Sequence, residues 1–312
     1  METKTVDYES RGTPWGQLGT DISGCQTITD ALRISGLDWT VRQAPVQSVE
    51  TFPVLASGYK LNIRESDNMP LGIVKDRYKV IQNDEAFAFT DSLAEEGVKF
   101  QQAGRFQQGR RVWILAKLPK KYSFGGDNIA PYILFINSHD GSTGIKVIMT
   151  PIRVICCNML NLAIKSAARS WSAIHAGDIS LKLQDARMTL IRAHSYMESL
   201  EHEVGLLNKN ILGQSDVAAL TDYLLPVDEK MSDLQKRNVL AQKEELLERY
   251  YHAPDLVEMP NTAYRYINAV SDFATHAEPL RKRKNYQEAL FSKVIDGHAL
   301  IDKAYQVLGR AV

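Results

Sequence analysis

The hydrophobic pattern of the chain changes near residue 180, and this change constrains the fold more than any other feature. Before it, four runs rich in β-branched and aromatic residues are separated by Gly- or Pro-containing turns, at 98–106, 109–118, 130–137 and 143–150. Such runs predict an antiparallel sheet built from hairpins. After it, apolar residues recur at helical spacing over 181–208, 215–224, 229–252, 261–276 and 285–308. We therefore expect an α+β protein, in which a curved antiparallel sheet with flanking helices precedes a helical C-terminal region.

Shorter elements are predicted before this sheet. Residues 27–36 have a Thr or Asp cap, an apolar side and a closing Gly, which is typical of a short helix. Asn83 is expected to cap a second helix that ends near Gly97. Between the two helices, alternating apolar and polar residues predict two or three strands over 39–49, 59–66 and 71–82.

A further helix is predicted to close the sheet between Thr150 and about Ser170. Thr150 and Pro151 match an N-cap and a first helical residue, and an apolar stripe follows them. We place the α+β core domain at 1–175, with a basic segment at 99–171, and the helical region at 176–312.

The first helix of the helical region carries two apolar series at seven-residue spacing. This register suits a seam between helices, and it is compatible both with packing inside the chain and with pairing between chains. The two series are Leu183, Leu190, Met197 and Val204, and Ala186, Ala193, Leu200 and Leu207.

Charge is segregated along a chain that is neutral overall. Residues 99–171 carry eleven Lys or Arg and two Asp, a net charge of +9, whereas 1–98 carries −6 and 172–312 carries −3. A groove for a polyanion requires such an excess of cations with interleaved aromatic rings, since cations bind phosphates and rings stack on bases. We expect the functional surface in this segment.

The candidate nucleic-acid-binding residues come from this segment. Alternate residues of a strand share a face, so Arg111, Trp113 and Lys117 are expected together, although Trp113 also suits a core position. The run at 281–284 has two interpretations, a solvated loop or a second phosphate site. The full set of candidates is Arg105, Arg110, Arg111, Trp113, Lys117, Lys120, Lys121, Tyr122, Arg153, Lys165, Arg169 and Trp171.

Signals for catalysis are weak. His139, Asp140 and Ser142, with Cys157, offer a base and a nucleophile, but the same run is typical of a hairpin turn because it contains Asp-Gly. The chain has no GxxxxGK[ST] loop, and its three cysteines lack the spacing of a disulfide framework or a zinc site. We therefore expect a protein that is not an enzyme and has no metal or cofactor.

Six strings occur in the order of one known family's motifs, over about residues 8–169. They are PWGQLGT (14–20), GLDWTV (36–41), LGIVKDRYKVIQNDEAF (71–87), GRRVWILAKLP (109–119), NSHDGSTG (137–144) and TPIRVICCNMLNLA (150–163). The chain thereby resembles the phage and plasmid-like proteins catalogued as a domain of unknown function. This resemblance implies a setting in mobile elements, often near recombination genes, and no established chemistry. In element order and charge alone, the chain is also similar to single-strand annealing recombinases.

These observations favour sequence-independent binding of single-stranded DNA or RNA by a homo-oligomer, with strand annealing, in phage or plasmid recombination or replication. One alternative is a non-enzymatic interaction protein that binds an acidic phage or host protein or counters host defence. A second alternative is a hydrolase that uses His139 and Cys157. No apolar run approaches the roughly 20 residues that span a bilayer, and the N-terminus lacks a signal-peptide pattern, so we expect a cytoplasmic protein without membrane contact.

Overall fold

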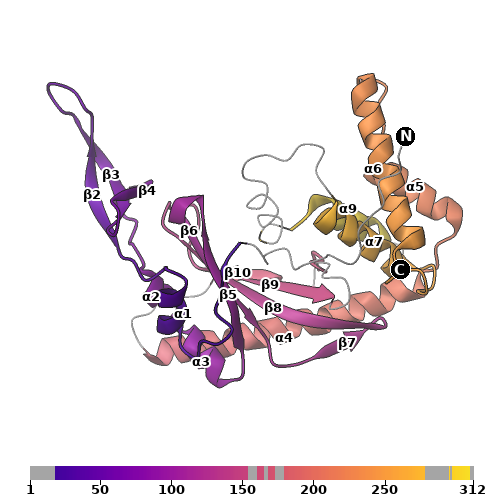
Figure 1. Ribbon diagram of the computed structural model, residues 1–312, viewed down its shortest axis with the longest axis horizontal. Coiled ribbons are helices and arrows are strands. Elements are labelled where there is room, and N and C mark those ends of the chain that lie inside the picture. The colour runs from indigo at the N-terminus through magenta and orange to yellow at the C-terminus, as the bar shows by residue number, and fades with distance from the viewer. Residues whose placement is uncertain are drawn as a thin grey trace.

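A seven-stranded antiparallel sheet forms the centre of the molecule in the computed structural model (Figure 1). The structure describes residues 18–153, 160–164, 168–172, 179–277, 295 and 297–309, without the side chains of 179–183. The four predicted sheet strands are confirmed as β5, β6, β8 and β9. The strand order is β1 (Thr20–Asp21), β5 (Lys99–Phe106), β6 (Arg111–Lys117), β8 (Asp127–Ser138), β9 (Lys146–Arg153) and β10 (Ser170–Ser172), with β7 (Tyr122–Phe124) paired to β8.

A second sheet of three antiparallel strands projects from this body and is called the arm below (Figure 1). It consists of β2 (Val41–Gln47), β3 (Leu55–Arg64) and β4 (Met69–Lys75). The alternating pattern predicted two or three strands here, and the structure has three, although β3 begins four residues earlier and β4 ends seven residues earlier than predicted. The arm and the body together confirm the α+β class.

Short helices join the arm to the body. The Thr27 hydroxyl caps the first of them by accepting a hydrogen bond from the Asp30 N–H at 3.2 Å. The second predicted helix is split in two, and its cap is Gln82, because the Asn83 side chain is buried and donates to the Leu37 carbonyl at 2.8 Å. These helices are α1 (Ile28–Ile34), α2 (Asn83–Phe87) and α3 (Thr90–Glu95).

The C-terminal region is helical, as expected. Figure 1 shows α4 running along the main sheet, with the later helices gathered beyond its C-terminal end. No helix in the described ranges is long and apolar enough to cross a membrane. Residues 285–294 of the last predicted helix lie outside the described residues. The helices are α4 (Ile179–Lys209), α5 (Gln214–Leu224), α6 (Asp233–His252), α7 (Ala263–His276) and α9 (Ala299–Leu308).

Both faces of the main sheet are buried. Val112, Ile114 and Ala116 of β6 belong to the larger core, which also contains residues of α1 to α4. Trp113 and Leu115 point the other way, into a smaller cluster that includes Leu134, Ile136 and Ile148. Gly104 lies opposite Trp113, and a Cβ at this glycine would be 2.6 Å from the indole ring, so a side chain there would displace the tryptophan.

The prediction of a helix from Thr150 to about Ser170 is wrong for the described residues of this stretch. Strand β9 continues through Pro151 to Arg153, residues 160–164 have no regular structure, and Ser170 begins β10. Pro151 is directly opposite Pro131 of β8. The carbonyls of the two prolines point away from each other: that of Pro151 accepts from the Leu160 N–H and that of Pro131 from the Leu118 N–H, each at 2.9 Å. Neither proline therefore needs an N–H toward the other strand.

The seven-residue series on α4 packs inside the chain. Of the members whose side chains are described, Leu190 is partly buried and Ala186, Ala193, Met197, Leu200, Val204 and Leu207 are buried. Helix α4 contacts α3, α7, β7 and β9 of its own chain. The apolar seam is thus filled by the protein's own sheet and helices.

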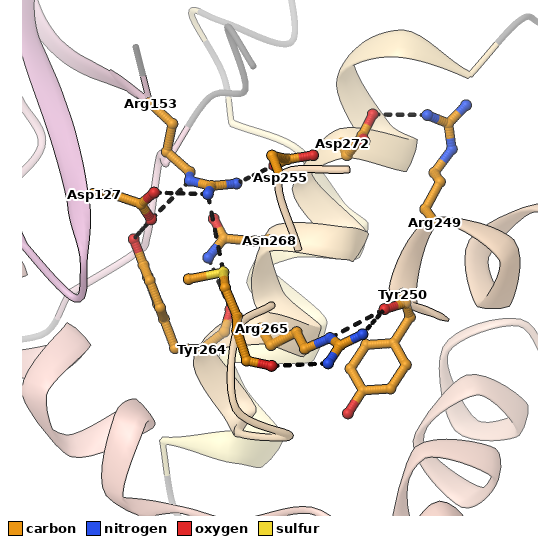
Figure 2. A network of polar contacts seen from close by, with 10 residues as sticks. Asp127, Arg153, Arg249, Tyr250, Asp255, Tyr264, Arg265, Asn268 and Asp272 are labelled. Atoms are coloured by element: carbon orange, nitrogen blue, oxygen red, sulfur yellow. Dashed lines mark hydrogen bonds and ion pairs between the residues drawn. The ribbon is translucent and has the colours of Figure 1, made fainter. Parts of the chain in front are cut away.

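A buried guanidinium joins the main sheet to the helical region (Figure 2). Arg153, at the end of β9, is 1% exposed and donates to both carboxylate oxygens of Asp127 at 2.7 and 2.8 Å. Its third nitrogen donates to Asp255, after α6, at 2.7 Å. The Tyr264 hydroxyl of α7 donates to Asp127 at 2.8 Å, and burial raises the pKa of this tyrosine. One cation therefore connects β8, β9 and the helices.

Replacing Arg153 with Met is expected to reduce the free energy of unfolding by about 3–5 kcal/mol, because Asp127 and Asp255 lose the cation that compensates their burial. Urea denaturation measures this change. The exposed Arg105→Ala is the control and should stay within about 0.5 kcal/mol of the parent. A loss below about 1 kcal/mol for Arg153→Met would show that the ion-pair network does not hold the two parts together.

Candidate nucleic-acid interface

The sheet separates the cations of the basic segment into two groups at opposite ends of its strands. At one end, called the lysine end below, Lys99 and Lys117 are directly opposite each other on β5 and β6, and Lys120 and Lys121 follow in the next turn. The other end holds Arg105, Arg110, Arg111 and Lys146 and is called the arginine end. The six-residue separation of Arg111 and Lys117 on β6 places the two ends roughly 20 Å apart.

The lysine end combines unneutralised charge with aromatic rings. Two like charges on directly opposite strand residues repel each other. Among the described residues, no carboxylate lies within ion-pair distance of Lys99, Lys117, Lys120 or Lys121. The Lys117 ammonium lies 5.8 Å from the centre of the Tyr132 ring, and the Lys120 ammonium lies 4.9 Å from that of Tyr122. An anion bound here would relieve the repulsion.

Three predicted contact residues are not available to a ligand, and their expected exposure is corrected here. Trp113 is fully buried in the smaller cluster, so it cannot stack on a base in this structure. Arg153 is committed to Asp127 and Asp255. Tyr122 is 5% exposed, its hydroxyl lies 2.7 Å from His194 Nδ1, and burial raises its pKa to about 12.

The remaining candidates are dispersed. Arg105 is opposite Val112, whose side chain lies in the larger core, so it projects from the face opposite Trp113. Arg169 donates to the carbonyls of Met149 and Ile295, at 3.3 and 2.9 Å, and Trp171 packs against the larger core. Arg110 is exposed, and Lys165 lies outside the described residues, as do Cys157 and the run at 281–284. Arg153, Lys165 and Arg169 were expected on one helix that would form a positive surface. The described residues of this stretch contain no helix, so that surface does not form as predicted.

The run at 137–144 forms the turn between β8 and β9, as one of its two interpretations predicted. The Asp140 carboxylate accepts from the Ser138 hydroxyl at 2.6 Å and from the Ser142 N–H at 2.9 Å, and Gly141 has a φ of 76°. Arg111 lies 4.0 Å from the same carboxylate and is therefore partly neutralised. The turn is held by its own hydrogen bonds.

This turn also supports the arm. Asn62 of β3, which is fully buried, donates to the His139 carbonyl at 2.7 Å. The Tyr78 hydroxyl donates to the Ser138 carbonyl, also at 2.7 Å. Gly72 of β4 passes so close that a Cβ there would lie 2.7 Å from Asp140 Cα. The strings at 71–87 and 137–144, far apart in sequence, thus meet where the arm joins the body.

His139 is a buried structural group in this junction. Its Nε2 lies 2.8 Å from Asn83 Oδ1, which can only accept, so Nε2 carries the proton. Its Nδ1 has no hydrogen-bond partner, and the ring packs 5.2 Å from that of Trp39. Burial lowers the pKa of His139 to about 4. His139 is thus fully buried with its Nε2 committed to Asn83, and Cys157, the other residue of the hydrolase alternative, lies outside the described residues, so that alternative stays a prediction.

Arg64 is a residue of the junction that was not predicted from the sequence. Arg64 of β3 donates to the Gln108 carbonyl at 2.7 Å and to Asp67, and it covers Trp39 with its guanidinium 5.2 Å from the ring centre. Gln107 and Gln108 have positive φ values of 48° and 61°, so Arg64 stabilises a strained turn between β5 and β6. Gln108 is 44 residues from Arg64 in the sequence, so no local pattern pointed to this contact.

The pKa of His139 gives the stability a defined pH dependence. The unfolded chain protonates this histidine below about pH 6.5, whereas the folded protein resists protonation down to about pH 4. Falling pH should therefore remove up to about 3 kcal/mol of stability across this window, with no effect above it. His139→Gln, which keeps the donor toward Asn83, should flatten this dependence in urea denaturation at a series of pH values. Parallel curves for the two proteins would contradict the assignment.

Comparisons with known proteins identify a family without a known activity. Neither the curated proteins nor the solved structures gave a match. The matched family is described as Domain of unknown function (DUF932), and its match covers residues 70–294. This range lies further toward the C-terminus than the expected 8–169, crosses residue 175 and includes most of the helical region. Since the match spans more than half of the sequence, the chain belongs to the family of this domain of unknown function.

Proposed function

We propose that the protein binds single-stranded nucleic acid without sequence preference and that the lysine end of the main sheet holds its phosphates. The observation that carries this proposal is the opposed pair Lys99 and Lys117. Together with Lys120 and Lys121, they form a group of four cations for which the described residues supply no carboxylate within ion-pair distance. A phosphate backbone is the polyanion that such a group favours.

The surroundings of the lysine end support a single strand over a duplex. Tyr132 lies in the same cross-strand row as Lys117, is partly exposed, and has the Lys117 ammonium 5.8 Å from the centre of its ring. Unpaired bases can stack on such a ring, whereas paired bases are already stacked on each other. The arginine end, roughly 20 Å away, supplies Arg110 as a further exposed cation for the same nucleic-acid strand.

Our proposal extends to the biological setting. Binding that depends on phosphates and stacking is independent of sequence, as strand annealing in recombination or replication of phage or plasmid DNA requires. An assembly of several copies would align several lysine ends along one strand. An acidic protein partner is the alternative ligand for the same cations, and the length of the oligonucleotide separates the two ligands.

Lys120→Ala/Lys121→Ala should weaken binding of a fluorescently labelled oligonucleotide and reduce its salt dependence. Each phosphate contact to a single strand contributes about 0.7 to the slope of log K against log salt, so losing two contacts should lower the slope by about 1.4. Fluorescence anisotropy over a salt series, with oligonucleotides of increasing length, measures both quantities.

Lys230→Ala/Arg237→Ala is the matched control, because it removes two exposed cations of the α5–α6 corner. This control should bind as the parent does. A salt-insensitive affinity of the parent, or equal slopes for the two double variants, would contradict binding at the lysine end. An affinity that does not change with oligonucleotide length would instead favour a protein ligand.

A further inference from the structure

We infer that the outer face of the arm is a second contact surface for single-stranded nucleic acid. This inference rests on the proposed function and adds a site that the basic segment does not contain. The outer face is defined by the strand register, in which Lys75 pairs with Tyr59, and Ile73 pairs with Leu61. Its members are Arg42, Ala44, Tyr59, Leu61, Ile63, Ile73 and Lys75, of which Ile63 is buried.

The register shows that this face points away from the body. The opposite face carries Asn62, paired with Gly72, and these two residues rest on the turn at His139 and Asp140. Tyr59 and Ile73 on the outer face are 47% and 60% exposed, whereas Asn62 is fully buried. The outer face is therefore exposed around Tyr59 and Ile73 but covered at Ile63, and the inner face holds the arm in place.

The strands of the arm carry its cations, whereas the acids Glu50, Glu65, Asp67 and Asp76 lie in the loops beside these strands. The three strands contain Arg42, Lys60, Arg64 and Lys75, and no Asp or Glu. Arg64 is neutralised by Asp67, but within the described ranges neither Arg42 nor Lys75 has a carboxylate at ion-pair distance. Arg42 donates only to the Asn68 side-chain carbonyl, at 3.2 Å. Both cations of the outer face are thus available to phosphates.

The outer face also provides a surface on which bases can stack. Tyr59 lies directly opposite Lys75, so an aromatic ring and a cation are neighbours on the same face. Leu61 and Ile73 form the adjacent row and extend the apolar surface beside the ring. An antiparallel sheet that presents an exposed aromatic ring beside a cation can serve as a platform for unpaired bases.

The edges of the arm argue against an added strand from a protein. Pro45 lies in β2 and Pro70 in β4, and these are the two edge strands of the sheet. Proline has no N–H to donate, so each edge is interrupted for a partner strand. Recognition through the arm therefore uses its face, where Arg42 and Lys75 favour an anionic ligand and Tyr59 favours one with bases to stack.

Tyr59→Ala/Lys75→Ala in the full chain should weaken the binding of a labelled single-stranded oligonucleotide at least tenfold in fluorescence anisotropy. Tyr59→Phe keeps the ring and should retain the parent affinity. Lys60→Ala removes a cation from the inner face of the same strand and should change the affinity less than threefold. Thermal unfolding of each variant checks the fold, and Lys75→Glu provides a second test because it reverses one exposed charge and keeps Tyr59.

The outcomes separate this inference from the proposed function. If the lysine-end variant weakens binding and the arm variants do not, the arm inference is overturned and the proposed function stands. If the parent protein binds no oligonucleotide, both are overturned. Sedimentation velocity tests whether the outer face instead binds a second copy of the chain. If Tyr59→Ala/Lys75→Ala dissociates an oligomer but leaves the oligonucleotide affinity unchanged, the face binds a second copy and our inference is wrong.

Discussion

Burial of the main sheet on both faces determines where the strands can carry charge. A cation in the middle of such a strand would lose its hydration without a partner, at a cost of several kcal/mol. Every Lys or Arg in the strands of this sheet accordingly lies at or next to a strand end, from Lys99 in β5 to Arg153 in β9. The concentration of charge in the sequence therefore becomes two separate groups in space. The strands of this sheet contain six Lys and Arg residues. One of them, Arg153, is buried because Asp127 and Asp255 neutralise its charge.

The alternation of residues in β6 predicted which side chains share a face but not which face is exposed. Arg111, Trp113 and Lys117 do lie on one face, and Ile114 and Ala116 on the other. The five apolar residues from Val112 to Ala116 follow one another without a polar residue, a pattern typical of a strand that is buried on both sides. This run was the signal that Trp113 belongs to the core.

The errors have a common physical origin in contacts between distant residues. Thr150 and Pro151 are as suitable for a helix start as for a strand end, and the sheet decides between them through Pro131. The partners of Arg153 are 26 and 102 residues away, so no local pattern could reveal that this cation is compensated. Helices α4 to α7 lie within a few residues of their predicted ranges because their apolar spacing is a local property, whereas the last predicted helix is interrupted at 297–298, where Gly297 has a φ of 84°.

The two facing prolines of β8 and β9 have a consequence for how these strands find each other during folding. Pro131 and Pro151 fit only while the nitrogen of each, which has no N–H, points away from the other strand. A slip of one residue in the pairing would turn one proline toward the partner strand, where a donor is required, and would also exchange the two faces of a strand. Misaligned hairpins are thus penalised twice, which favours the native pairing at the step when the longest strand pair of the sheet forms.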